Sequence, residues 1–303
     1  MRILLLGANG QVGRECRRSL AGLGDLICAT RNGALQDGTV CEVADFDDPD
    51  GVGALVRRIQ PDVVVSAAAY TAVDKAESEP EAASRANART PGEIARACAD
   101  VDAYFVHYST DYVFDGEGDV PYPVDAPTAP LGAYGVSKLA GEEAIRASGC
   151  RHAILRTAWV YASHGKNFLL TMLRLARERE ELRVVADQIG TPTPAALIAD
   201  VTAGIVACGQ RPSGTWHLTP DGQVSWHGFA QAIIDGAHQR GLLSSKPIVS
   251  PIATRDFPTP AKRPAWSVLD NTLLKRDWAV ELPTWQQGMD GVLDELAGRA
   301  TVG

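Results

Sequence analysis

Closely spaced cysteines are absent from this sequence. Its cysteines are scattered singly, and no Cys-x-x-Cys pair occurs. Neither a zinc site nor a disulfide framework is therefore expected, and a reducing cytoplasm is the predicted location. The cysteines are Cys16, Cys28, Cys41, Cys98, Cys150 and Cys208.

An excess of positive charge and long apolar runs are absent as well. The chain has 29 Lys and Arg against 37 Asp and Glu, with a net charge of -8. A basic surface for nucleic acid or for an anionic membrane is therefore not indicated. No apolar run is long enough to span a bilayer. The apolar start Arg2–Leu6 runs directly into a glycine-rich segment, which is typical of a buried strand and not of a signal peptide.

What the chain does contain, over its first 160 residues, is an alternation of short apolar runs with longer helical patterns. Near-continuous apolar strands separated by helices are typical of a parallel sheet buried on both faces. We therefore predict an α/β fold built on a Rossmann-type doubly wound parallel sheet. The predicted strands are Arg2–Leu6, Leu26–Ala29, Asp62–Ala67, Tyr104–Tyr108 and His152–Arg156. The predicted helices are Gln11–Leu20, Asp48–Gln60, Glu79–Asp100 and Tyr134–Ala147.

Prolines become frequent after residue 160. This part predicts a smaller, loop-rich α/β domain, and such loops commonly line ligand clefts. We expect a dinucleotide-binding domain over residues 1–160 and a mainly substrate-binding domain over residues 161–303, interleaved so that later segments return to the first domain. The expected later helices are Asn167–Arg179, Ala195–Cys208, Phe229–Arg240 and Trp285–Ala297, and the expected strands are Leu182–Val185 and Trp216–Leu218.

A glycine-rich loop follows the first strand and opens a helix, in the run Gly7-Ala8-Asn9-Gly10-Gln11-Val12-Gly13. Gly7 allows a tight turn, Gly10 lets a pyrophosphate approach the backbone, and Gly13 permits close helix packing. The helix start then offers unpaired N–H groups to phosphates. A turn without a ligand is the alternative, but the position after an N-terminal strand favours a dinucleotide site.

The end of the second strand bears on the choice between NADPH and NADH. An acidic residue there would bind the ribose 2′-hydroxyl of NADH, whereas this chain has Thr30 and Arg31. Arg31 could instead face a 2′-phosphate, which favours NADPH. The alternative is that Arg31 is a solvated surface charge.

Two further segments lie where ligands bind in such folds, beyond the strand ends. Asp45 and Phe46 are candidates to flank an adenine, and Ala69, Tyr70 and Thr71 follow the strand Asp62–Ala67. The small residues before Tyr70 suit close passage of a cofactor, although plain packing would also explain them.

Tyr134 and Lys138 are four residues apart in a predicted helix and therefore share one face. A nearby lysine cation should lower the phenol pKa and make Tyr134 a usable general acid. Thr110 and Asp111 follow the strand Tyr104–Tyr108, and a hydroxyl there can bond a substrate carbonyl. Capping or turn roles are the alternative for Thr110 and Asp111. Together with the glycine loop, the pattern predicts ketone reduction by hydride transfer.

These motifs resemble those of extended short-chain dehydrogenases/reductases and, more closely, of the dTDP-4-dehydrorhamnose reductase family, over nearly the whole chain. The resemblance implies reduction of the 4-keto group of a dTDP-4-dehydro-6-deoxy-L-sugar to give dTDP-L-rhamnose for cell-surface polysaccharides. The resemblance rests on the segments Gly7–Gly13, Ala67–Ser78, Asn87, His107–Phe114, Tyr134–Glu142, Arg156–Tyr161, Asp187–Thr193 and Thr259–Pro264.

The resemblance also implies roles for individual residues. Tyr134 would be the proton donor, with Thr110 and Lys138 completing a triad. Thr110, Asp111 and Trp159 would contact the sugar, and Arg263 is a candidate for the substrate diphosphate. Trp159 could instead be a core residue and Arg263 a solvated charge. The implied cofactor residues are Gly10, Gln11, Val12, Asp45, Phe46, Ala69, Tyr70 and Thr71.

Some members of this family form a magnesium-linked dimer through three glutamates. Glu15 and Glu295 match two of them, but Ala196 stands at the third position. Mg²⁺ requires a defined shell of oxygen ligands, and the alternative for the two carboxylates is that they are surface charges. The resemblance therefore implies a possible homodimer, and two of the three glutamates for Mg²⁺.

Two other classes of function stay open. An epimerase or another nucleotide-sugar reductase would share the glycine loop and the Tyr134–Lys138 pair. Regulatory subunits built on the same scaffold bind a partner enzyme, but their catalytic residues tend to be lost, whereas Thr110, Tyr134 and Lys138 are all present here.

Overall fold

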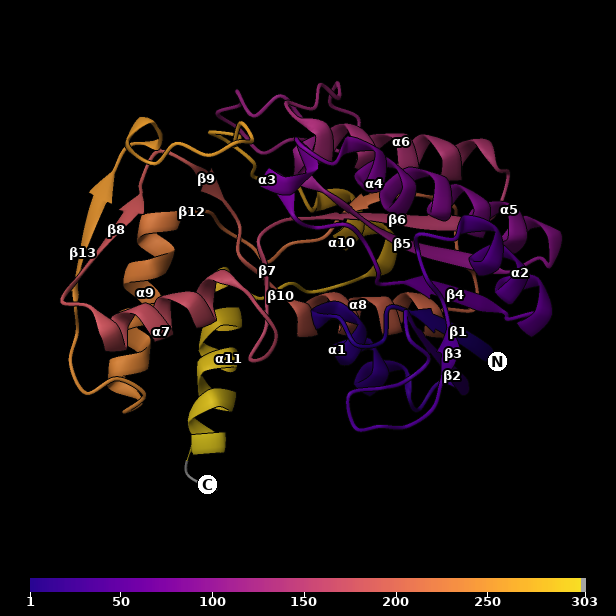
Figure 1. The fold of residues 1–303 in the computed structure, drawn as a ribbon, viewed down its shortest axis with the longest axis horizontal. Helices are drawn as coiled ribbons and strands as arrows, with labels where there is room; N and C mark the ends of the chain where they lie inside the picture. Colours follow the sequence, from indigo (N-terminus) through magenta and orange to yellow (C-terminus); the bar gives the residue numbers. More distant parts are fainter. Residues whose placement is uncertain (301–303) are drawn as a thin grey trace.

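The computed structural model describes residues 1–300 and has a parallel sheet of seven strands at its centre (Figure 1). The strand order is β11-β6-β5-β4-β1-β2-β3. The order reverses between β1 and β4, which makes this the switch point where such sheets bind ligands. The predicted Rossmann-type sheet is therefore confirmed. Its strands are β1 (Arg2–Leu6), β2 (Asp25–Thr30), β3 (Glu42–Val43), β4 (Val63–Ser66), β5 (Tyr104–Thr110), β6 (His152–Thr157) and β11 (Gly214–His217).

Helices cover both faces of this sheet (Figure 1). Ile3 and Leu5 of β1 face one apolar core, and Leu4 and Leu6 face the other. Because both faces are buried, the strands are continuously apolar. One layer contains α2 (Pro49–Ile59), α4 (Pro80–Ser84), α5 (Thr90–Asp100) and α6 (Ala133–Ala147); the other contains α1 (Gln11–Leu20), α8 (Ala195–Ala207) and α10 (Thr272–Trp278).

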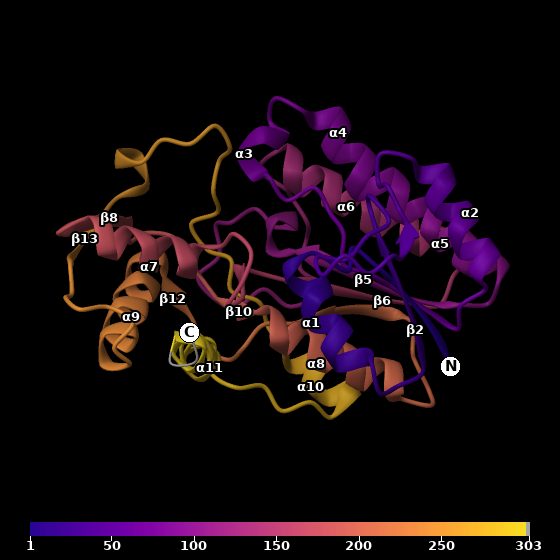
Figure 2. The same cartoon turned by 60° about the horizontal axis from the view of Figure 1, so that its bottom comes forward.

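A second lobe lies beside the sheet, beyond the carboxyl ends of its strands (Figures 1 and 2). It has its own apolar core, in which Phe229, Ile233 and Leu293 are fully buried. Its elements are α7 (Phe168–Glu178), β8 (Glu181–Val185), α9 (Trp226–Gln239), β13 (Ile248–Ile252) and α11 (Trp285–Ala300). Two short strand pairs connect this region, β7 (Val160–Tyr161) with β10 (Thr193–Pro194) and β9 (Ile189–Gly190) with β12 (Val224–Ser225).

The chain passes between the sheet and the second lobe several times. After α7 and β8 it returns to the sheet, where α8 packs on α1 and β11 pairs with β6. It then builds α9 and β13, returns for α10, and ends with α11 in the second lobe. The two lobes are therefore interwoven in sequence.

The prediction of one regular helix over Glu79–Asp100 was wrong in one respect. The helical turns continue, but a π-helical segment spans Arg85–Arg89 between α4 and α5. Pro91 has no N–H to bond the carbonyl of Asn87, so the regular ladder cannot continue there. The Thr90 N–H reaches back instead to the carbonyl of Arg85. Such π-helical turns are frequent at functional sites.

Several short elements were not predicted. β13 contains Pro251, which cannot donate to a ladder and is tolerated because β13 pairs only with β8. The helix α3 (Val73–Ala76) and α10 are too short for a clear periodic pattern. Over residues 1–300, no helix combines the length and apolar character required to cross a membrane.

Candidate active site

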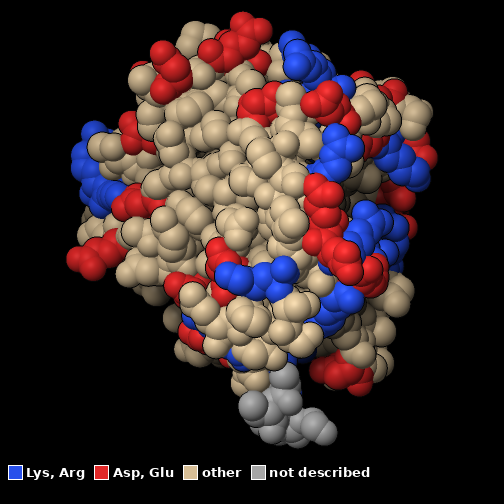
Figure 3. Space-filling model, turned by 90° about the vertical axis from the view of Figure 1, so that its left-hand side faces the viewer, with Lys and Arg blue, Asp and Glu red and all other residues tan. Residues whose placement is uncertain are grey.

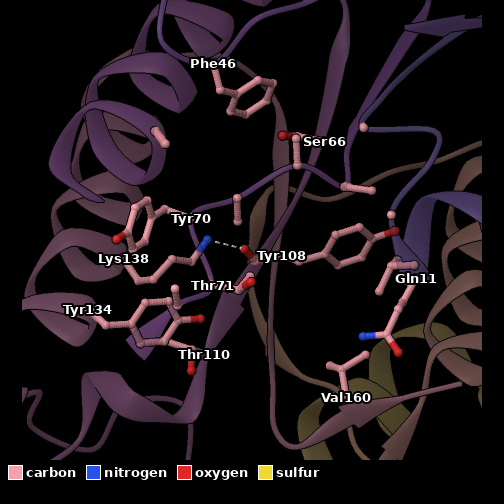
Figure 4. Close-up of a pocket in the computed structure, with 18 of the residues that line it drawn as sticks. Gln11, Phe46, Ser66, Tyr70, Thr71, Tyr108, Thr110, Tyr134, Lys138 and Val160 are labelled. Atoms are coloured by element: carbon pink, nitrogen blue, oxygen red, sulfur yellow. Dashed lines mark hydrogen bonds between the residues drawn. The ribbon is translucent and has the colours of Figure 1, made fainter. Parts of the chain in front are cut away.

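A cavity of about 1030 Å³ opens at the carboxyl ends of β1, β4, β5 and β6. The glycine loop and the segments after β4, β5 and β6 form its walls, and α6 contributes Tyr134 and Lys138. Lys166 and Trp226 line it from the side of the second lobe. Figure 4 shows Gln11 and Val160 across this space from Tyr134 and Lys138. The cavity therefore brings most of the predicted site residues together.

The glycine loop has the geometry that its spacing predicted. Gly7 has a φ of +80°, and a Cβ there would lie 2.7 Å from the Ala68 nitrogen. A Cβ on Gly13 would lie 2.1 Å from the Gly7 carbonyl oxygen, so Gly13 is required for packing and does not line the cavity. Gly10 caps α1 without a side-chain bond to its first N–H groups. Asn9, Gly10, Gln11 and Val12 do line the cavity.

At the other end of the cavity Arg31 has an acidic neighbour. Its exposed guanidinium lies 3.3 Å from an oxygen of Asp45. Arg31 and Phe46 line the cavity, whereas Asp45 does not, and the nearby lining carboxylate is Asp47. Thr30 is buried and its hydroxyl donates to the backbone of the following turn at Ala34. The position at which an acidic residue would bind the ribose of NADH is therefore occupied by a structural hydroxyl.

Asn87 fixes the segment after β4. Its amide oxygen accepts from the Tyr70 N–H at 2.9 Å, and its amide nitrogen donates to the Tyr70 carbonyl at 3.0 Å. The same nitrogen donates to the Ser137 hydroxyl on α6. Asn87 is fully buried within the π-helical turn. The turn thus ties Ala69, Tyr70 and Thr71, which line the cavity, to the helix that carries Tyr134.

Tyr134 lies in the first turn of α6, and its ring packs edge-on against Tyr112 at 5.5 Å between centroids. Burial raises the pKa of Tyr134, and a hydrogen bond with Thr110 lowers it by less. Asp111 and Tyr112 raise this pKa further. The phenol is therefore protonated at neutral pH and can donate a proton to a ligand in the cavity.

Lys138 does share a helix face with Tyr134, as predicted, but it acts on other groups. Its Nζ lies 2.6 Å from the carbonyl oxygen of Tyr108 and 3.2 Å from Nε2 of His107 (Figure 4 marks the first contact). Burial lowers the pKa of Lys138 to about 8, which Glu142 opposes. The expected lowering of the Tyr134 pKa by Lys138 is wrong for this structure, because the ammonium turns towards β5 and burial of the phenol dominates.

Thr110 and Asp111 form a buried pair at the end of β5. The Thr110 hydroxyl donates to an Asp111 carboxylate oxygen at 2.8 Å and accepts from the Tyr112 N–H. Burial raises the pKa of Asp111 to about 6, while bonds from Thr110 and Ser267 lower it. Because a hydroxyl has one proton, Thr110 can donate to a ligand only by turning away from Asp111.

Trp159 stands at the cavity edge in an unusual conformation. Its φ is +47°, which is rare for a bulky residue and characteristic of functional sites. Its ring stacks on Trp226 with centroids 3.5 Å apart and an interplanar angle of 9°. A Cβ on Gly190 would lie 2.6 Å from the Trp159 ring, so only a glycine leaves room for the ring there.

Arg263 does not line the cavity in this structure. Its guanidinium donates to Asp74 on α3 at 2.6 Å and to the Tyr112 hydroxyl at 3.1 Å. Arg263 therefore connects the segment that follows β13 to the wall behind Tyr112. An anion would have to compete with Asp74 for this side chain.

The glutamates considered for Mg²⁺ already have basic partners. Glu15 lies 2.8 Å from the His164 ring and 3.3 Å from Arg18, and Glu295 bonds Arg299. Within residues 1–300, no three acidic, histidine or cysteine side chains are grouped as ligands for a metal ion. Each glutamate would therefore have to leave its basic partner to bind Mg²⁺.

Sequence reasoning did not find Trp226, Lys166 and Asp47, all of which line the cavity. Both Trp226, the first residue of α9, and Lys166, just before α7, lie far along the chain from the glycine loop. The one signal that could have pointed to Trp226 was a tryptophan at the start of a helix. Tryptophans in that position are equally common as packing residues. Arg31 and Lys75, which also line the cavity, form ion pairs with Asp45 and Glu79, whereas no acidic partner of Lys166 is found within residues 1–300.

A dinucleotide-type glycine loop opposite a helix with a Tyr-x-x-x-Lys pair defines the class of extended short-chain dehydrogenases/reductases, and this chain has that arrangement. The family model described as RmlD substrate binding domain matches residues 1–297. The chain belongs to the dTDP-4-dehydrorhamnose reductase family, as its relatives demonstrate.

Among these relatives, the dTDP-4-dehydrorhamnose reductase of Burkholderia thailandensis is 48% identical over 297 residues, which cover 94% of this chain and 96% of the relative. A crystal structure of such a reductase from Clostridium acetobutylicum has a TM-score of 0.88 and 37% identity, covering 98% of this chain and 99% of that one. The Bacillus anthracis reductase in complex with NADP has a TM-score of 0.88 and 33% identity, covering 97% and 99%.

Proposed function

We propose that this protein reduces the 4-keto group of a dTDP-4-dehydro-6-deoxy-L-sugar with a nicotinamide cofactor, which gives dTDP-L-rhamnose. The observation that carries the proposal is the protonated, partly buried Tyr134 beside Thr110 in a cavity whose opposite wall is the glycine loop. The names of the relatives support the sugar nucleotide as the substrate class.

The proposed reaction uses two side chains at the sugar, Tyr134 and Thr110. A bound nicotinamide cofactor would supply the hydride for the keto carbon. Tyr134 gives its phenolic proton to the carbonyl oxygen. Thr110 donates a hydrogen bond to the same oxygen after turning from Asp111. Lys138 supplies a buried positive charge at the cavity wall between β5 and α6. The products are the alcohol and the oxidised cofactor.

We assign the cofactor to the space between the glycine loop and the Ala69–Thr71 segment, and the sugar nucleotide to the space beside Trp159 and the second lobe. The dinucleotide diphosphate would then meet the first N–H groups of α1. NADPH or NADH fits this arrangement, and the NADP complex of the Bacillus anthracis relative favours NADPH. Lys166 is proposed to attract the diphosphate of one of the two ligands.

The variant Tyr134→Phe tests the proposal. It should fold and bind NADPH normally but lose turnover, because the phenyl ring has no proton to donate. The assay follows NADPH oxidation with enzymatically prepared dTDP-4-keto-6-deoxy-L-sugar and identifies the product by mass spectrometry and NMR. Near-normal turnover in this variant would contradict the assignment of Tyr134.

Assays on the same purified protein distinguish a reductase from an epimerase, the alternative activity within this class. An epimerase returns the hydride to the sugar and keeps its oxidised cofactor through purification, whereas a reductase consumes one NADPH per sugar. Stoichiometric NADPH oxidation supports the reductase. Isomerisation without net NADPH oxidation would favour the epimerase. A regulatory subunit would bind nucleotide without either reaction.

A further inference from the structure

A buried histidine lies directly against Lys138. His107 stands in the middle of β5, and only 1% of its surface and 2% of that of Lys138 is exposed. The lysine Nζ lies 3.2 Å from Nε2 of His107 and 2.6 Å from the carbonyl oxygen of Tyr108. Two adjacent residues of one strand thus provide both acceptors.

The chemistry of the pair fixes the state of the imidazole. A lysine ammonium has three N–H donors and no acceptor, so Nε2 must accept and the ring proton must be on Nδ1. Burial, then the charge of Lys138 and the neighbouring His152, lower the pKa of His107 well below its ordinary value. The ring is therefore neutral, and the neutral ring is the form that can accept from Lys138.

The other ring nitrogen of His107 shows that the ring does not pass a proton onward. Nδ1 of His107 is buried and has no hydrogen-bond partner among residues 1–300. A proton arriving at the ring would have no group to pass to. His107 therefore suits a fixed acceptor and not a relay.

Two fixed acceptors restrict the lysine. They hold two of its three N–H bonds, and within the described chain no acceptor is recorded for the third. Lys138 lines the cavity, so the third N–H is available to a ligand there. The groups that bear on its charge are His107 from β5 and Glu142, one turn further along α6.

We propose that His107 is a positioning residue, whose Nε2 acts with the Tyr108 carbonyl to aim the remaining N–H of Lys138 at a hydroxyl-bearing ligand, the ribose of the dinucleotide. This inference rests on the proposed function for the identity of that ligand. Loss of the acceptor would let the ammonium turn and would destabilise its charged form.

The experiment compares His107→Gln, His107→Asn and His107→Leu. A glutamine amide reaches the position of Nε2, an asparagine amide reaches only that of Nδ1, and leucine offers no acceptor. NADPH dissociation constants are measured by fluorescence between pH 6.5 and 9.5, together with the pH profile of kcat/KM. Tyr104 lies on the same strand as His107, and Tyr104→Phe removes only its hydrogen bond to the Pro212 carbonyl, so this variant controls for disturbance of β5.

We expect His107→Gln to remain within about threefold of the parent, whereas His107→Asn and His107→Leu bind NADPH about tenfold more weakly. In these two variants NADPH affinity should also begin to fall at a pH about one unit lower than in the parent, because the lysine cation loses a stabilising acceptor and its pKa decreases. Equal losses for Gln and Asn would overturn the positioning role. If His107→Leu does not fold, the Gln and Asn pair decides the question.

A double-mutant cycle combines the His107 variants with Lys138→Met. In that background His107→Asn should change NADPH affinity by less than twofold, because the group that it positions is gone. A full tenfold loss there would show a structural effect and overturn the inference. Because the measured quantity is NADPH affinity, the result does not depend on which sugar is the substrate. Failure of the unaltered protein to reduce the keto-sugar while it still binds NADPH would refute only the proposed function.

Discussion

The side-chain amide of Asn87 donates a hydrogen bond of 3.0 Å to the hydroxyl of Ser137, which lies between Tyr134 and Lys138 on α6. The Ser137 hydroxyl in turn donates to the Tyr134 carbonyl at 2.7 Å. The π-helical turn therefore holds both the proposed catalytic helix and Tyr70 of the cavity wall through one side chain.

Asn87→Ala is expected to destabilise the protein by about 3 kcal/mol, because it leaves buried groups of Tyr70 and Ser137 without partners. Ser137→Ala removes a single partner and should cost about 1 kcal/mol. Urea unfolding of the three proteins measures both values. Equal losses from the two variants would mean that Asn87 does not hold Tyr70.

The pairing of Arg31 with Asp45 predicts how cofactor choice can be changed. Arg31→Ala should raise the KM for NADPH about tenfold, the effect of losing one charge-assisted bond to a phosphate, and leave that for NADH nearly unchanged. Asp45→Asn should lower the KM for NADPH, because the guanidinium loses its competing carboxylate. Steady-state kinetics with both cofactors test this. An unchanged NADPH preference in Arg31→Ala would exclude Arg31 as the selector.

The stacked rings of Trp159 and Trp226 predict a separate effect on the sugar nucleotide. Trp226→Ala removes the support on one face of Trp159 and should raise the KM for the sugar nucleotide about tenfold, with little change for NADPH. Trp226→Phe keeps a ring and should be milder. Trp278→Phe, at a tryptophan pair remote from the cavity, is the matched control. A loss confined to NADPH binding would place Trp226 at the cofactor.

The buried ion pair of Glu142 and Arg156 connects α6 to β6. Arg156 donates to both Glu142 oxygens, at 2.9 and 2.7 Å. Burial by itself would raise the pKa of Glu142, but Arg156, with Ser109 and Arg146, lowers it overall. Glu142→Gln leaves Arg156 buried without its counter-charge and should cost about 3 kcal/mol.

This pair also has a defined pH dependence. Because the pKa of Glu142 is lowered on folding, its contribution is present above the unfolded value of about 4.3 and is lost as the pH falls through the folded value. Acid unfolding of Glu142→Gln should therefore be flatter than that of the parent below pH 4. Parallel stability curves from pH 2 to 7 would contradict the assigned role of the carboxylate.

The parts of the fold that could be predicted are those decided by local pattern. β1, α1 and the glycine loop follow from one continuous stretch, and α6 was predicted within one residue of its observed start. Asp48 accepts from the Gly51 N–H, and Gln60 ends α2 with a φ of 48°, so this helix too has local signals at both ends.

Contacts between distant parts of the chain could not be predicted in the same way. The position of Trp226 against Trp159 depends on how α9 packs in the second lobe, and the direction of Lys138 depends on acceptors supplied by β5. The Tyr-x-x-x-Lys spacing placed both side chains on one helix face but could not state which groups they meet. Arg263 illustrates the same limit, since its partner Asp74 is remote in sequence.

The strand β11 completes the sheet beside β6, although more than fifty residues separate them in the chain. Until residue 217 has left the ribosome, the outer edge of β6 has no strand to pair with. The helix α1 likewise lacks its neighbour α8 until residue 207 has been translated. The helix α7 and the strand β8 emerge earlier, and β8 must wait for β13. During synthesis, each lobe therefore depends on a segment that is translated after the other lobe has begun to form.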